Sequence, residues 1–129
     1  MGNGCGNFSA CFNGNISFII LLFKFIMNLA SIIENRKTEK RVALTPEIAK
    51  KYLSLGFKIS LPKDYGIHLG FNDQEYKNSG VNFFDTEEEL FKNAEIFIQL
   101  GLPDNEKLSL FKEKQTLIGS LNAFSNKEK

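Results

Sequence analysis

The sequence predicts an α/β domain in which about five parallel strands form a doubly wound, flavodoxin-like sheet. From residue 27 onward, short apolar runs of strand length alternate with segments of helical periodicity. The helical segments carry recognisable start and stop residues, and the connections between elements are short. This alternation implies right-handed crossovers that place helices on both faces of the sheet. A chain of 129 residues has room for one such domain with a hydrophobic core.

The first strand and helix are expected before residue 57. The strand is the apolar run 29–33 (LASII), which is followed by a polar loop at 34–40. The helix is expected to begin after Thr45, whose hydroxyl caps it, with Pro46 at the first helical position. It is expected to end at Gly56, because glycine adopts positive φ without strain. Its predicted buried face consists of Ile48, Ala49, Tyr52 and Leu53.

The middle of the chain continues the pattern. A second strand is expected at 57–61, a short helix at 73–79 that stops at Gly80, and a third strand at 81–84. Thr86 and Glu89 are spaced as a capping box, in which each side chain accepts a hydrogen bond from the other residue's backbone N–H. This predicts a further helix, buried through Leu90, Phe91 and Ala94.

The last elements are a strand at 95–100, a helix at 105–112 that packs through Leu108 and Phe111, and a strand at 116–121. Ligands of open parallel sheets bind beyond the carboxyl ends of the strands. The last such end falls at 122–126, where the chain stops without a closing helix. We therefore expect the domain at 27–129 to be a fragment.

Residues 1–26 differ in composition from the rest and are interpreted as a leader of open role. Their apolar run, 16–27, is shorter than the roughly 20 residues of a membrane-spanning helix. A signal peptide has a basic side chain before its apolar run, and here no basic side chain precedes that run. Gly6 stands where a myristoylation motif has Ser or Thr. We interpret these residues as an upstream extension of the reading frame, with translation starting at Met27.

Composition excludes several classes of function. Sixteen basic and fifteen acidic side chains leave a net charge of +1, which gives no reason to expect a nucleic-acid partner. Two cysteines, both before residue 12, and a single histidine exclude a disulfide framework and offer little to a metal site. No Gly-rich phosphate loop follows a predicted strand, so the chain itself lacks a dinucleotide-binding turn.

Few residues offer chemistry by their type and position. Arg41 lies between the first strand and helix, near the carboxyl edge, where a guanidinium can bind a carboxylate or phosphate through two hydrogen bonds. From spacing alone, the favoured interpretation is a solvent-exposed arginine near a helix start. His68 lies in a loop and is interpreted as a surface or structural residue and not as a catalytic one. No nucleophile and base can be paired, so no catalytic residue is predicted.

The segment ENRKTEKRVALTPEIAKKYLSLGFKI resembles the amino-terminal signature of the alanine dehydrogenase and transhydrogenase family. Members open with a strand, a short charged loop, RVALTP and a helix that ends in Gly-Phe or Gly-His. The resemblance continues through GFNDQEYKNSGVNFF, TEEELFKNAEIFIQLGLP and KEKQTLIGSLNAFSN, so it covers about 27–129.

The resemblance also implies residue roles. The positions at which this sequence departs from the alanine dehydrogenase pattern favour the transhydrogenase branch of the family. In alanine dehydrogenases the RVAL arginine binds the substrate carboxylate, a lysine of the strand-four motif, which is of the KVKEP type, contacts the substrate, and a histidine after strand five is the acid–base catalyst. Here Arg41 is kept, Gln99 and Gly101 stand where lysines could, and no histidine follows strand five. LNAFSN keeps the alanine and Asn126 of the transhydrogenase pattern but neither of its prolines. Arg41, Gln99 and Asn126 are therefore the ligand-side candidates.

The transhydrogenase branch implies hydride transfer from NADH on this subunit to NADP+ on a partner subunit, coupled to proton translocation. The implied cofactors are NAD and NADP. The implied partners are a second copy of the NAD-binding subunit and the membrane-embedded and NADP-binding subunits, at the cytoplasmic face of a bacterial inner membrane. The Gly-rich half that binds the pyrophosphate would follow Lys129, so we expect this fragment alone to be inactive and to bind NAD weakly or not at all. The alternatives are the amino-terminal domain of an alanine dehydrogenase and a non-catalytic domain that binds a partner through its sheet edge.

Overall fold

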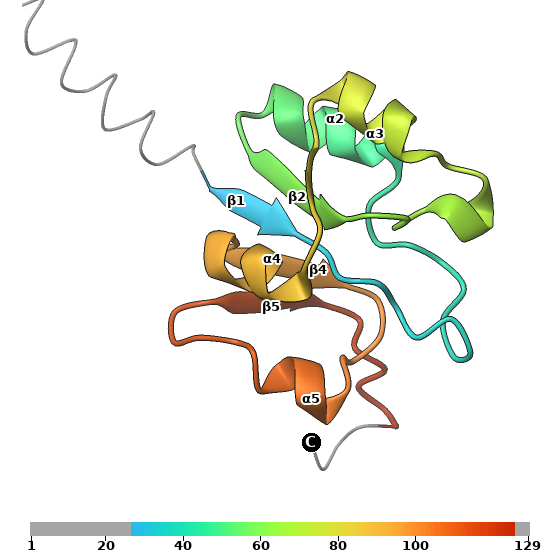
Figure 1. The fold of residues 1–129 in the computed structure, drawn as a ribbon. Coiled ribbons are helices and arrows are strands. Elements are labelled where there is room, and N and C mark those ends of the chain that lie inside the picture. The colour runs from blue at the N-terminus through green and yellow to red at the C-terminus, as the bar shows by residue number, and fades with distance from the viewer. Residues whose placement is uncertain (1–26, 126–129) are drawn as a thin grey trace, which may run out of the picture.

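Five parallel strands form a single sheet in the computed structural model, which describes residues 27–125 (Figure 1). The predicted leader 1–26 and Asn126 lie outside the described residues. The strands are β1 (Asn28–Ala30), β2 (Lys58–Pro62), β3 (Asn82–Phe84), β4 (Ile96–Gln99) and β5 (Thr116–Gly119). Their order in the sheet is β3-β2-β1-β4-β5. The predicted α/β class, with a parallel sheet of five strands, is confirmed.

The strand order corrects the flavodoxin-like part of the prediction, because 3-2-1-4-5 is the order of the first five strands of a Rossmann-type doubly wound sheet. Flavodoxin-like sheets have the order 2-1-3-4-5, whereas this sheet begins with a third strand at its edge. That strand, β3, pairs parallel to β2, with Ser60 opposite Asn82. Without β3, the other four strands follow the flavodoxin pattern. The difference therefore comes from one three-residue strand that extends the sheet beyond β2.

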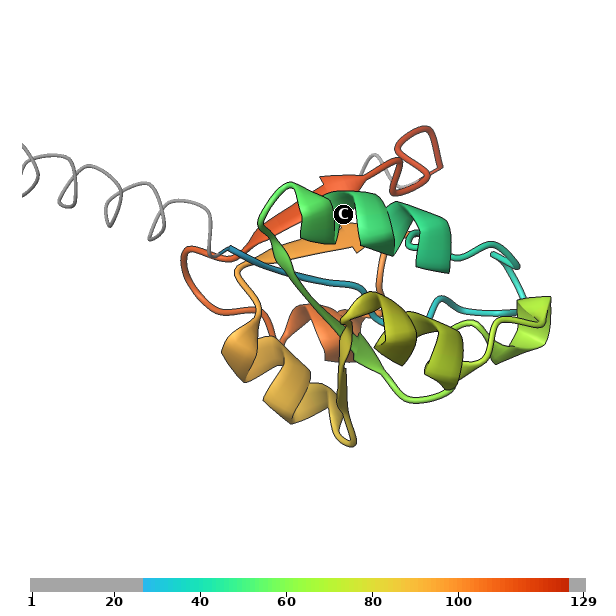
Figure 2. The same ribbon diagram turned by 90° about the horizontal axis from the view of Figure 1, so that it is seen from above.

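Helices cover both faces of the sheet, as predicted. Helices α2 (Pro46–Ser54) and α3 (Asp73–Ser79) contribute to one buried cluster, and α4 (Glu87–Asn93) contributes to the other. Figure 2 shows α2 and α4 on opposite sides of the strands. The chain moves one way along the sheet from β1 to β3 and the other way from β3 to β5. Right-handed crossovers that run in opposite directions place their helices on opposite faces.

The helix ends confirm most of the predicted caps. The Thr45 hydroxyl accepts a hydrogen bond from the Ile48 N–H at the start of α2. Gly56 and Gly80 have φ of 94° and 100°, which explains why the chain leaves the helix at these glycines. The Thr86 hydroxyl accepts from the Glu89 N–H, but within residues 27–125 the reciprocal bond to the Glu89 carboxylate is not formed. The capping box is therefore half made.

The predicted buried residues are largely confirmed, with one correction. Ala49, Leu90 and Phe91 are buried, but Ile48 is 38% exposed. Ala49 is the one fully buried residue of α2, so the buried stripe of this helix is narrower than predicted. On the other face, Phe91, Phe97 and Phe111 pack ring against ring, with centroids 4.7 to 5.0 Å apart.

Five elements, namely β1, β3, β4, α5 and β5, are shorter than the sequence predicted. The first strand ends at Ala30, and the N–H of Ile32 donates to the side-chain oxygen of Gln99 and not to a backbone carbonyl of the neighbouring strand. Helix α5 covers only Asn105–Leu108, although Phe111 beyond it still packs as predicted. The last strand ends at Gly119 because Leu121 and Asn122 turn the chain with φ of 48° and 47°.

Candidate functional site: a cleft at the carboxyl edge of the sheet

A cleft of about 550 Å³ opens at the carboxyl edge of the sheet. Its walls are the segment after β1, the loop after β4, α5 and the turn after β5. The chain leaves β1 toward β2 on one side, while β4 lies on the other side, so the connections diverge here. Such a switch point is where open parallel sheets bind ligands. The fold therefore places the cleft where a ligand site is expected.

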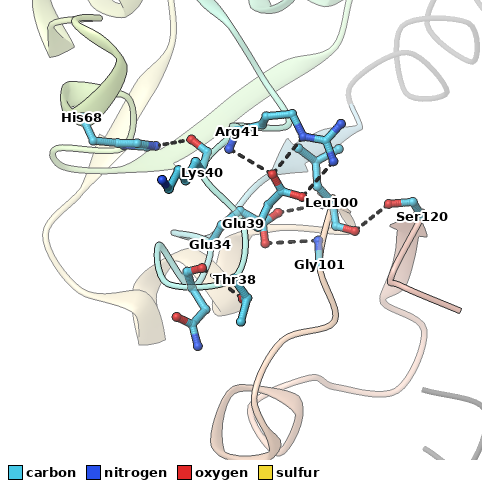
Figure 3. Close-up of polar contacts among 10 residues, drawn as sticks. Glu34, Thr38, Glu39, Lys40, Arg41, His68, Leu100, Gly101 and Ser120 are labelled. Atoms are coloured by element: carbon cyan, nitrogen blue, oxygen red, sulfur yellow. Dashed lines mark hydrogen bonds and ion pairs between the residues drawn. The ribbon is translucent and has the colours of Figure 1, made fainter. Parts of the chain in front are cut away.

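Glu34 is the buried acidic group of the cleft (Figure 3). It follows β1, is 8% exposed, and its carboxylate accepts hydrogen bonds from the N–H groups of Leu100 (2.6 Å) and Gly101 (3.2 Å). Burial raises the pKa of Glu34 above its ordinary value, and the two backbone hydrogen bonds partly oppose this shift. The carboxylate thus occupies the pair of amides that the end of β4 would otherwise present to an anion.

Gln99, the last residue of β4, also lines the cleft and is 1% exposed. Its Oε1 accepts hydrogen bonds from the Ser31 hydroxyl (2.6 Å) and the Ile32 N–H (3.0 Å). The Ser31 Oγ lies 2.7 Å from the hydroxyl of Tyr65, which comes from the loop after β2. The Tyr65 oxygen accepts from backbone amides that precede α2. Burial raises the pKa of Tyr65 to about 12, so this hydroxyl stays protonated.

The cation of the cleft is already paired. Lys107, on α5, lines the cleft, and its Nζ lies 2.8 Å from Glu87 Oε1 on α4. A longer contact of 3.5 Å joins the same ammonium to the carbonyl of Ile33. Asp104 adds a carboxylate at the rim of the loop after β4. Among the residues described, the cleft therefore offers a ligand no unpaired positive charge.

Arg41 is not among the residues that line the cleft. Its side chain is 73% exposed and forms a two-point contact with Glu39, with Nε–Oε1 at 2.9 Å and a second N–O distance of 2.8 Å (Figure 3). The hydrogen bonds from the Arg41 side chain are the largest cause that lowers the pKa of Glu39 to about 2. His68 Nε2 lies 2.8 Å from the Lys40 carbonyl oxygen, which fits the structural role predicted for it.

The structure brings one of the three ligand-side candidates into the cleft. Gln99 lines it, Arg41 is turned to Glu39, and Asn126 lies beyond the described residues. Sequence reasoning missed Glu34, although the rule that ligands gather at strand carboxyl ends points to the residue after the first apolar run. It also missed the pair formed by Lys107 and Glu87, since no local pattern joins two helices. Within residues 27–125 no group of three or more metal-ligating side chains occurs, and no helix has the length and hydrophobicity needed to cross a membrane.

Comparisons with known proteins identify relatives in both branches. The family model described as "Alanine dehydrogenase/PNT, N-terminal domain" matches residues 32–129. The first portion of NAD(P) transhydrogenase subunit alpha from Rickettsia prowazekii is 28% identical over 106 residues, which cover 79% of this chain and 28% of that protein. Alanine dehydrogenase 1 of Staphylococcus aureus (strain bovine RF122 / ET3-1) is 32% identical over 102 residues, 79% of this chain and 27% of that protein.

Solved structures similar to this chain also include both a transhydrogenase and an alanine dehydrogenase. A transhydrogenase from Sinorhizobium meliloti superposes with a TM-score of 0.68 at 26% identity, covering 77% of this chain and 30% of that one. An L-alanine dehydrogenase superposes with a TM-score of 0.66 at 22% identity, covering 72% and 26%, and shows a shared fold. The chain thus spans somewhat more than a quarter of the length of the relatives it matches.

Proposed function

Because the chain belongs to the alanine dehydrogenase/PNT N-terminal domain family, we propose that it is the amino-terminal portion of the NAD-binding subunit of a proton-translocating NAD(P) transhydrogenase. Such an enzyme transfers hydride between NADH and NADP+. The family is one of NAD(P)-dependent oxidoreductases, so the proposal concerns the branch and not the class of enzyme.

The charge of the cleft is the observation that carries this proposal. An enzyme that acts on alanine has to hold a substrate carboxylate, which in proteins is the work of a lysine or arginine. Arg41 is bound to Glu39 outside the cleft, and Lys107 is bound to Glu87. At the exit of β4 stand Gln99 and Gly101, neither of which carries a charge. The described part of the cleft is therefore poorly suited to an amino acid and compatible with an uncharged group.

The described residues do not form a site for the phosphates of a dinucleotide. No Gly-rich turn follows a strand between residues 27 and 125, and the amides of Leu100 and Gly101 are occupied by Glu34. The segment would therefore contribute one wall of the cleft that faces the nicotinamide. That wall would orient the ring and exclude water, while the nicotinamide itself supplies the hydride chemistry.

The proposed assembly follows from the same branch. It contains a second copy of the NAD-binding subunit together with membrane-embedded and NADP-binding subunits, at the cytoplasmic face of the membrane. A second candidate function is that of an alanine dehydrogenase, which the 32% identity to the S. aureus enzyme favours. The two candidates differ in what the enzyme does with alanine.

Two assays on the complete protein that contains this segment distinguish the candidates. A transhydrogenase, reconstituted with its partner subunits, reduces NADP+ with NADH and forms no NADH from NAD+ and alanine. The Arg41→Gln variant is a sharp control, because it should raise the KM for alanine strongly if Arg41 binds the substrate carboxylate. Alanine-dependent NADH formation that Arg41→Gln abolishes would overturn the transhydrogenase proposal.

Calorimetry on the isolated chain tests whether the dinucleotide site lies outside this segment. Because the described residues lack a phosphate site, the chain by itself should bind NADH weakly or not at all. Tight binding of NADH to residues 1–129 would show that the dinucleotide site lies within this segment, contrary to the proposal.

A further inference from the structure

We propose that Gln99 is a specificity-determining residue of the cleft, whose side-chain nitrogen donates a hydrogen bond to an uncharged carbonyl oxygen such as that of a carboxamide. The same surroundings would disfavour a carboxylate or a phosphate. The inference rests on the proposed function, since it takes the cleft as the wall that faces the nicotinamide, and its test measures binding and not hydride transfer.

The orientation of the Gln99 amide is fixed by its partners. The Ile32 N–H can only donate, so the atom 3.0 Å from it must be the oxygen of the Gln99 side chain. The Ser31 hydroxyl, 2.6 Å away, donates its single proton to the same oxygen. Ser31 must then accept from Tyr65, 2.7 Å distant. This directed chain excludes the flipped amide, which would place a donor against a donor.

The nitrogen of the same amide has no hydrogen-bond partner among the described residues. Gln99 is 1% exposed and lines the cleft, and among residues 27–125 its Nε2 makes no hydrogen bond. The amide nitrogen carries two protons, and neither has a protein acceptor among residues 27–125, so both are available to a ligand that enters the cleft. A ligand that brings an acceptor to this place would satisfy at least one of them. The site is therefore prepared for an acceptor before any ligand binds.

The neighbouring groups set the charge of that acceptor. The Glu34 carboxylate already holds the two backbone amides at the end of β4, so a second anion would find its donors occupied and a negative charge beside it. Asp104 adds another carboxylate, and the ammonium of Lys107 is bound to Glu87. A neutral carbonyl escapes this repulsion and still accepts from Gln99.

Titration of the complete protein that contains this segment, by heteronuclear NMR with nicotinamide and with nicotinate, tests the proposal. The two probes share a ring and differ by the exchange of an amide NH2 for a carboxylate oxygen. In the wild type, nicotinamide should shift the Gln99 side-chain NH2 resonances and bind at least about tenfold more tightly than nicotinate. The side-chain resonances report the contact directly and require no variant.

Gln99→Glu is the matched variant, because the retained oxygen can still accept from Ser31 and Ile32 while the donor nitrogen becomes an acceptor. It should weaken nicotinamide binding by about tenfold or more. Gln74→Glu makes the same chemical change on α3, where Gln74 donates to Asn78 at the surface, and should leave binding unchanged. Equal binding of the two probes, absent shifts at Gln99, or unchanged binding in Gln99→Glu would each overturn the inference. None of these results depends on hydride transfer, so the transhydrogenase assay fails or succeeds separately.

Discussion

The carboxylate of Glu34 accepts a 2.6 Å hydrogen bond from the backbone N–H of Leu100, which fastens the segment after β1 to the segment after β4. The contact crosses the switch point of the sheet and closes one wall of the cleft. Its physical cost is the burial of a carboxyl group, which shows as a raised pKa.

The pH dependence of stability should carry the signature of Glu34. Its folded-state pKa is raised above the ordinary value of 4.5, mainly by burial, so the native state holds this proton more tightly than the unfolded chain does. The contribution is fully present below pH 4.5 and is lost as pH rises through the folded-state pKa. Urea unfolding of the wild type and Glu34→Gln from pH 4 upward should therefore show the wild type losing stability relative to the variant. A relative gain with rising pH would contradict the burial of Glu34.

Glu39 should titrate in the opposite direction. Its pKa is about 2, below the ordinary value of 4.5, chiefly because the Arg41 side chain donates hydrogen bonds to it. The stability that it contributes is present above pH 4.5 and is lost as pH falls toward 2. Carboxyl ¹³C NMR should find the Glu39 pKa near 2 in the wild type and higher in Arg41→Gln, which loses the side-chain hydrogen bonds but keeps the one from its backbone N–H. Lys51→Gln, which removes the surface partner of Glu47, should leave the Glu39 titration where it was.

The Tyr65 hydroxyl should contribute to stability through its hydrogen bonds. It accepts from the N–H groups of Ala43 and Leu44 and lies against the Ser31 hydroxyl in a buried site. Tyr65→Phe leaves these buried groups without their hydrogen-bond partner and should lower the free energy of unfolding by about 2 kcal/mol or more. Tyr52→Phe is the matched control, because within residues 27–125 the Tyr52 hydroxyl makes no hydrogen bond and its ring packs edge-on against Phe57. Equal losses in the two variants would refute the buried network.

Gly119 should tolerate no side chain. A Cβ built there would lie within covalent distance of the Gln99 carbonyl oxygen, because β5 approaches β4 closely. Gly119→Ala should lower the free energy of unfolding by about 3 kcal/mol or more and remove hydrogen-exchange protection from the β5 amides. Ile118→Ala in the same strand removes a half-exposed side chain and should preserve that protection. Retained β5 protection in Gly119→Ala would show that the strands are farther apart than described.

The features that the sequence predicted correctly depend on neighbours a few residues apart. Thr45 and Thr86 cap their helices through N–H groups three residues on, and Gly56 and Gly80 end helices by a positive φ of their own. Such local interactions leave a spacing that can be recognised. The strands that ended early did so for other reasons, such as the Gln99 side chain that takes the Ile32 N–H.

The features of the site that were missed depend on distant neighbours. Glu34 and Leu100 are 66 positions apart, and Gln99 and Ser31 are 68 apart, so no spacing relates them. Arg41 is the instructive exception, because its partner Glu39 is only two residues away. A carboxylate so close in sequence could have been recognised as a competitor for the guanidinium. The role of Asn126 stays a prediction, since that residue lies outside 27–125.

The place of β1 in the sheet has a consequence for how the chain is made. Leu29 lies opposite Ile59 on one side and opposite Ile96 on the other, so the two edges of β1 are completed by segments that leave the ribosome at different times. The half with β2 can form first, and closing the longer loop to β4 is the slower step. Until β4 has emerged, the nascent chain presents one edge of β1 without a partner. During that interval the unpaired edge of β1 can pair with another chain and aggregate, or be bound by a chaperone.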